Sequence, residues 1–106
     1  MTKNSIFIAF PPLDATGLTA SKSTHFGTGY PKTHTLQLQI AGSPSNVSLI
    51  VEGKLAGADT WITLATLTDG DPSFIVDKPI MYIRGNLGTL TAGTDPTVQL
   101  LYLGVP

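Results

Sequence analysis

The sequence predicts an all-β fold: a single antiparallel β-sandwich, jelly-roll-like, with about seven or eight short strands and minimal helix. Two observations support this prediction. Segments in which apolar and polar residues alternate recur roughly every eight to twelve residues, separated by turns rich in Gly, Pro, Asp and Ser. In addition, no window of about eleven residues shows the i, i+3, i+4, i+7 apolar spacing of an amphipathic helix.

The first third of the chain is its least regular part. Residues 6–10 form a short apolar run that ends at Pro11 and Pro12, because proline has no amide proton to donate to a sheet. Residues 13–35 are rich in Thr, Ser and Gly. We therefore expect loop in this segment, with one short strand around residues 18–26.

The middle of the chain holds the clearest strands. Residues 35–40 alternate strictly, with leucine or isoleucine at every second position, which indicates a strand with one buried and one polar face. A turn over residues 41–46 leads to a second alternating strand at residues 47–52. The next strand, residues 61–67, begins at Trp61, the only tryptophan of the chain. We expect these last two strands to form a β-hairpin.

Three more strands are expected in the last third. Residues 74–76 form a short apolar run, and residues 80–86 are dense in β-branched and aromatic side chains. Residues 87–96 are rich in Gly and Thr and are expected to be a loop. The final strand is predicted at residues 98–103.

The composition indicates one domain that works in an assembly. At 106 residues the chain can bury one modest core, and we expect a single domain over residues 1–106. Charged residues make up only 12% of the chain, well below the usual quarter. A lone soluble protein usually carries more charge. We therefore expect a homo-oligomer, with a trimer as one option.

Several classes of protein are excluded by charge and by cysteine content. A net charge of −1 with scattered basic residues argues against nucleic-acid binding, which needs a basic surface. With no cysteine, the chain has no disulfide and no thiolate chemistry. We expect no membrane contact, because the sequence shows neither a signal peptide nor a run of about 18 apolar residues.

Two segments resemble small β-sandwich proteins of tailed-phage virions. The first is V-S-L-I-V-E-G at residues 47–53 with D-T-W-I-T-L at residues 59–64, where that family has an E-G-S-x-D-G-x-x-W-x-x-L hairpin. The second is I-M-Y-I-R-G-N-L at residues 80–87 with L-T-A-G-T-D-P-T-V at residues 90–98. There the family has an R-Y-I-R strand and a T-G-G-T-x-P-T-V loop and strand. The resemblance covers about residues 34–105.

This resemblance implies a role in the virion, as a head decoration (cement) protein or a small tail or fibre component. A looser form of the hairpin occurs in discoidin-like domains that bind carbohydrates and lipids. The sequence departs from the family at residues 57–59, where Gly-Ala-Asp replaces the usual Asp-Gly, so the resemblance does not specify the turn type. Residues 1–33 show no resemblance.

Catalytic motifs are missing, so we expect no enzymatic activity and no cofactor. Ser, His and Asp all occur, but the chain has no Gly-x-Ser-x-Gly elbow to present a nucleophile. Its seven acidic residues fall mostly in turns, which does not suggest the facing carboxylates of a glycosidase. Gly-Thr-Gly at residues 27–29 is too short for a phosphate loop.

Two groups of residues could bind a metal ion only if other residues supplied further ligands. Asp69, Asp71 and Asp77 lack the ligand spacing of a calcium loop, and we interpret them as turn residues. His25 and His34 could join a zinc site on a three-fold axis, but no nearby carboxylate completes it. Positions in surface loops are the simpler interpretation of both histidines.

Trp61 and Arg84 each have two interpretations. Trp61 could stack on a sugar ring, but a position in the core of the sandwich is favoured. Arg84 lies in an apolar strand, so we expect it to reach solvent at the strand end or to pair with Glu52 or Asp77. At an interface it could bind a neighbouring subunit, because arginine suits buried ion pairs.

We predict a non-enzymatic structural protein of a phage virion, made in the host cytoplasm, with capsid decoration (cement) as the first choice. Its expected partners are the major capsid protein or other virion subunits, and residues 1–33 are expected to act as a contact arm. The residues expected to bind partners are Phe7, Phe10, Leu13, Phe26, Tyr30 and Arg84.

Two alternatives remain open. A carbohydrate- or receptor-binding module of a tail or fibre would use exposed aromatic side chains, with Tyr30, Trp61, Tyr82 and Tyr102 as candidates. A tail-associated adaptor would differ from a decoration protein only in its position in the particle.

Overall fold

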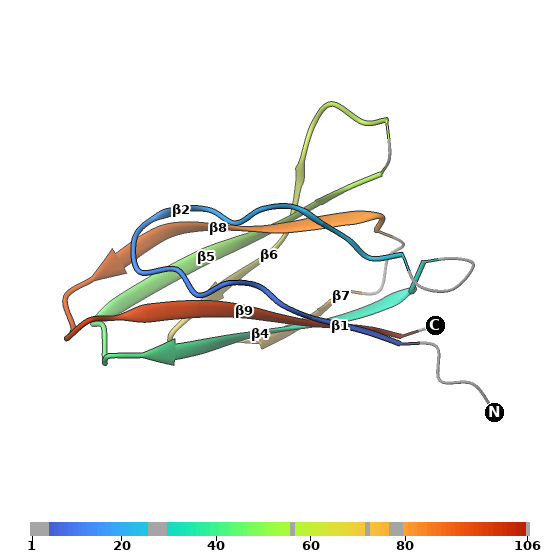
Figure 1. Cartoon of the computed structure of the whole chain (residues 1–106). Coiled ribbons are helices and arrows are strands. Elements are labelled where there is room, and N and C mark those ends of the chain that lie inside the picture. The colour runs from blue at the N-terminus through green and yellow to red at the C-terminus, as the bar shows by residue number, and fades with distance from the viewer. Residues whose placement is uncertain (1–4, 26–29, 56, 72, 77–79, 106) are drawn as a thin grey trace.

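The computed structural model describes residues 5–25, 30–55, 57–71, 73–76 and 80–105. Figure 1 shows that their strands form two sheets, one lying over the other. All strand pairs are antiparallel. The described residues contain no helix, and so none that is long and apolar enough to span a membrane.

The two sheets differ in strand order. Sheet A has the order β1-β9-β4-β7, and sheet B has the order β2-β8-β5-β6 with β3 also paired to β8. The strands of sheet A are β1 (Ile6–Ala9), β4 (Thr33–Ala41), β7 (Ser73–Val76) and β9 (Thr97–Val105). Those of sheet B are β2 (Gly17–Leu18), β3 (Lys22–Ser23), β5 (Asn46–Lys54), β6 (Ile62–Thr68) and β8 (Tyr82–Thr91). The predicted all-β sandwich is confirmed, with nine strands in the described residues in place of seven or eight.

The structure differs from the sequence prediction in two segments. The single strand expected around residues 18–26 is replaced by the two short strands β2 and β3. The first half of the loop expected over residues 87–96 is strand, because β8 continues to Thr91. The pairing of β8 with β5 shifts by one residue at Gly88, so this glycine marks a bulge inside a strand.

The core lies between the sheets, where alternate residues of β4, β5, β8 and β9 point inward. This is the period of two that the sequence shows in its middle third. Burying one such leucine or valine stabilises the fold by roughly 1.5–3 kcal/mol. The buried cluster comprises Phe10, Leu36, Leu38, Val47, Leu49, Val51, Ala65, Leu67, Ile83, Leu87, Val98, Leu100 and Tyr102.

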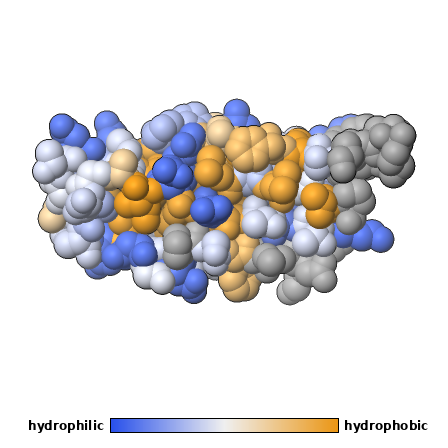
Figure 2. Space-filling view, turned by 90° about the horizontal axis from the view of Figure 1, so that it is seen from below, coloured by the Kyte–Doolittle hydropathy of each residue, from blue (hydrophilic) through white to orange (hydrophobic). Residues whose placement is uncertain are grey.

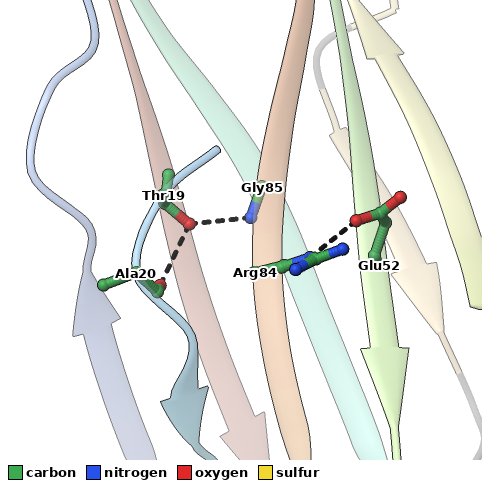
Figure 3. Close-up of polar contacts among 5 residues, drawn as sticks. All are labelled: Thr19, Ala20, Glu52, Arg84 and Gly85. Carbon is green, nitrogen blue, oxygen red and sulfur yellow. Dashed lines mark hydrogen bonds and ion pairs between the residues drawn. The ribbon is translucent and has the colours of Figure 1, made fainter. Parts of the chain in front are cut away.

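The described part of the N-terminal segment is bound to both sheets. After β1 has paired with β9, the amide of Phe10 donates to the Leu100 carbonyl at 3.0 Å, and Leu13 and Val98 exchange two backbone hydrogen bonds. The chain then crosses to sheet B, where the Thr19 amide donates to the Gly85 carbonyl. The Thr19 hydroxyl accepts from the Gly85 amide, as Figure 3 shows. Residues 5–25 therefore close one side of the sandwich.

This arrangement corrects the predicted role of Phe10 in the contact arm. Phe10 was expected to bind a partner, but its side chain is fully buried in the core. Removing residues 1–12 would delete β1 and leave a cavity where Phe10 packs, which typically costs about 3–5 kcal/mol for a phenylalanine. A truncated chain of that kind would lack part of the core.

His34 also differs from the expectation of a surface loop. It lies in β4 with no exposed surface, and its Nδ1 is hydrogen-bonded to the hydroxyl of Tyr102 on β9. Burial raises the pKa of Tyr102 above its usual value, and a hydrogen bond with Thr24 partly offsets this. The pair satisfies two polar side chains inside the core.

Two glycine turns contact each other at one end of the sandwich. A Cβ on Gly42 would lie 2.5 Å from the carbonyl oxygen of Thr94, and a Cβ on Gly93 would lie 2.6 Å from the carbonyl oxygen of Gly42. Both glycines have positive φ angles, 84° and 86°. Ala92 also has a positive φ of 60°, at a position where the resembling phage proteins carry glycine.

Candidate functional site

The outer face of sheet A is free of charge. Strands β1, β4, β7 and β9 contain no Asp, Glu, Lys or Arg. We call the outward side of β1, β4 and β9 the neutral face; alternation and register assign to it Phe7, Ala9, Thr33, Thr35, Gln37, Gln39, Ala41, Thr97, Gln99, Leu101, Leu103 and Val105. Figure 2 looks at the molecule from this side, and apolar atoms gather in the middle of the view.

The apolar centre of the neutral face is a cross-strand group. Phe7 on β1 and Thr35 on β4 both pair with Leu103 on β9, one on each side. Phe7 is 63% exposed and Leu103 is 41% exposed. Beside them lies a shallow hollow of about 220 Å³, lined by Phe7, Thr35, Gln37, Leu101, Tyr102 and Leu103.

A face of this kind is typical of a contact surface. Outer faces of antiparallel sheets usually carry polar and charged side chains that keep them in water. Here, threonine and glutamine surround large apolar side chains, and no charge would have to be stripped of water when another surface covers them. Exposed apolar groups surrounded by polar residues mark sites of protein contact.

The outer face of sheet B carries a different group, which we call the tryptophan cluster: Glu52, Lys54, Trp61 and Arg84. Arg84 Nε lies 2.7 Å from Glu52 Oε1, as Figure 3 shows. The guanidinium carbon of Arg84 is 4.2 Å from the centre of the Trp61 ring, and Lys54 Nζ is 5.0 Å from it. Arg84 is the only arginine of the chain, and Glu52 is its only glutamate. Of the alternatives expected for Arg84, pairing with Glu52 is confirmed.

The position of Trp61 corrects the prediction that it anchors the core. Val51 pairs with Ala65, but the next residue, Glu52, pairs with Thr63, so Leu64 is an extra residue in β6. In a regular strand, Trp61 and Ala65 are four residues apart and would point to the same face. The extra residue shifts the alternation by one position, so their side chains point to opposite faces. Ala65 therefore faces the core, whereas Thr63 and the partly exposed Trp61 lie on the outer side.

The remaining predicted contact residues do not form one site. Leu13 is half-buried against the core. Tyr30 is half-buried, and its ring lies 5.2 Å from that of His25, edge to face. Phe26 lies outside the described residues, as does Asp77. Of the six residues, Phe7 lies on the neutral face and Arg84 on the opposite outer face.

The described part of the chain contains no candidate metal centre. Within these residues, no group of three or more His, Cys, Asp or Glu side chains is placed to hold an ion. Asp69 and Asp71 belong to the turn between β6 and β7, where the Asp71 amide donates to the carbonyl and hydroxyl oxygens of Thr68. This fits the interpretation of these aspartates as turn residues.

Comparisons with known proteins show a shared fold. No family model and no curated protein sequence matches the chain. The structure is similar to that of YomS, a protein derived from the SPBc2 prophage, with a TM-score of 0.69, 9% identity, and coverage of 100% of this chain and 96% of YomS. The core of Drosophila NLP aligns with a TM-score of 0.48 and 15% identity over 96% of this chain and 97% of that one, too low to support an argument.

Proposed function

We propose that this chain is a non-enzymatic structural protein of a phage virion, with capsid decoration (cement) as its role. It would bind the major capsid protein or other virion subunits, form a homo-oligomer, and reside in the virion after synthesis in the host cytoplasm. The fold shared with a prophage-derived protein supports a phage origin. The resemblance of residues 34–105 to virion proteins supports the same proposal.

The neutral face is the observation that carries this proposal. A subunit held in a large assembly needs surface that can be covered at little desolvation cost, and an uncharged face with an apolar centre meets that need. The rigid sandwich behind this face also favours assembly, because little conformational entropy is lost when a preformed surface binds.

The test is the composition and architecture of purified particles. Particles produced from the genome that encodes this chain should contain it at a copy number set by capsid symmetry, as measured by quantitative mass spectrometry. Antibody labelling in electron micrographs should place it on heads. Label on tails would shift the role to the tail-associated adaptor, and absence of the chain from intact particles would overturn the proposal.

A second candidate is favoured by the position of Trp61. Because its ring lies on the outer side of sheet B beside Arg84 and Lys54, it could contact a sugar in a tail or fibre protein. Glycan-array binding by the full chain that disappears in Trp61→Ala, while Phe7→Ala keeps it, would support a carbohydrate-binding module. If the wild-type chain binds no glycan on the array, this candidate is excluded for the glycans tested.

A further inference from the structure

We propose that the neutral face is a two-fold interface between two copies of this chain. This inference rests on the proposed structural role, because it names the occupant of the surface that supports that role. Contacts with other virion subunits would then use the remaining surface of the dimer, including the tryptophan cluster on the opposite face.

The absence of charge suits pairing with an identical surface. In a two-fold interface the same patch occurs on both copies, and charged groups near the axis meet like charges. Strands β1, β4, β7 and β9 carry none, so two copies can meet without such repulsion. The face also offers no charge that would favour an acidic or basic partner.

The strand order makes the face complementary to itself. In the order β1-β9-β4, the protruding Phe7 lies on one side of β9 and Thr35 and Gln37 lie on the other, and all three line the hollow that spans β9. A two-fold axis that runs along β9 in the plane of the interface exchanges these two sides. Phe7 of each copy is then placed over Thr35 and Gln37 of the other, and Leu101 and Leu103 lie closest to the axis.

The size of the face fits a dimer of modest affinity. With strands about 4.8 Å apart and about 3.3 Å per residue, the four residues of β1 and the nine residues each of β4 and β9 cover roughly 350 Å². Two copies would bury about 700 Å², and the uneven surface made by the side chains increases this value. That area lies below the roughly 1,200 Å² at which stable interfaces begin, so we expect a weak dimer that dissociates in the micromolar range or above.

Sedimentation velocity on the purified full chain tests the proposal. From about 1 µM to 1 mM, the wild-type chain should change from monomer to dimer. Phe7→Lys should raise the dissociation constant at least about tenfold, because two lysines would enter an uncharged interface. Leu18→Lys is the matched control: Leu18 is 53% exposed on sheet B, and its substitution should leave the dimer intact. A wild-type chain that stays monomeric, or a dimer insensitive to Phe7→Lys, overturns the proposal.

Crosslinking gives a second readout that does not depend on a disruptive variant. The chain has no cysteine, so Leu103→Cys introduces a single thiol close to the proposed axis. A short bifunctional maleimide should join two copies through this thiol but not through the thiol of Leu18→Cys. Equal crosslinking of both variants, or none at position 103, contradicts the two-fold arrangement.

The two proposals fail in different ways. If the chain is monomeric in solution and in particles yet is incorporated into virions, the dimer is wrong and the structural role stands. If the chain forms the dimer but is absent from particles, the structural role is wrong and the interface stands.

Discussion

The two outer faces of the sandwich are both formed by antiparallel strands, but their side chains differ in charge. On sheet A, outward positions hold threonine, glutamine and large apolar residues, and every strand is uncharged. On sheet B, the strands contain Lys22, Glu52, Lys54 and Arg84. Three of these charges gather around Trp61.

This difference shows how one fold can separate association from solubility. The charges of sheet B keep one side of the molecule hydrated, which limits unwanted contacts. The uncharged side can be covered without removing water from an ion. Only 12% of the residues are charged, and among the described strands they occur only in sheet B. The uncharged outer face of sheet A is therefore the one available to a neighbouring molecule.

A substitution at Gly53 of β5, opposite the bulge in β6, should have the largest effect on the outer face of sheet B. Gly53 faces Leu64 and Ile80, and a Cβ there would lie 2.8 and 2.9 Å from their side-chain carbons. Gly53→Ala should lower the free energy of unfolding by roughly 1–3 kcal/mol, because the added methyl overpacks the site. It should also change the fluorescence of Trp61, measured together with urea unfolding.

A matched control for this substitution is Gly88→Ala in the bulge of β8. A Cβ on Gly88 would lie 3.9 Å from its nearest neighbour, the Ser48 carbonyl oxygen, which is ordinary contact. If both variants lose the same stability, crowding at Gly53 is not the cause.

The ion pair in the tryptophan cluster should have the next largest effect. Arg84→Ala leaves Glu52, whose side chain is 16% exposed, without its partner and uncovers Trp61. We expect a loss of about 1–2 kcal/mol in urea unfolding, between the values for exposed and fully buried pairs. Arg84→Lys should lose less, because it keeps the charge but not the planar stacking. Equal losses for both variants would mean that the charge is unimportant.

Substitution on the neutral face should barely change stability. Phe7 is 63% exposed, so Phe7→Lys should alter the free energy of unfolding by less than about 0.5 kcal/mol at concentrations where the chain is monomeric. The measurement is urea unfolding below about 1 µM, with circular dichroism to confirm the fold. A loss above about 2 kcal/mol would show that Phe7 supports the monomer instead of an interface.

Salt should have the smallest effect and separates the two faces directly. Raising sodium chloride from about 0.05 to about 0.5 M screens exposed charges. The dimer should change its dissociation constant by less than about twofold in sedimentation experiments, because its interface contains no ion. A weakening of tenfold or more would show that charged residues outside the neutral face take part.

Several elements could be predicted from the sequence because they depend on local alternation. Strands β4, β5 and β9 and the hairpin of β5 and β6 lie where the sequence places them, since period-two patterning specifies both the strand and its buried face. The pairing of Arg84 with Glu52 was one of the alternatives expected for this arginine. Neighbouring strands bring the two side chains opposite each other in register.

Other features could not be predicted from the chain alone. Leu64 carries no local signal that it is the extra residue of a bulge, yet this residue decides that Trp61 lies outside the core. Phe10 and His34 sit in segments that look irregular or exposed, and both are buried by contacts with residues far along the chain. The sequence around residues 87–91 resembles a loop because it contains Gly88, but this glycine forms a bulge inside strand β8.

By itself the sequence determined the fold class, the low charge and the resemblance to virion proteins, because composition and alternation are local properties of the chain. Only the tertiary structure decided which side chains share a surface. Phe7 of β1, Thr35 of β4 and Leu103 of β9 are adjacent only because strand order and register place them side by side. Pairing between distant strands is set by the packing of the whole core, and that pairing creates the neutral face.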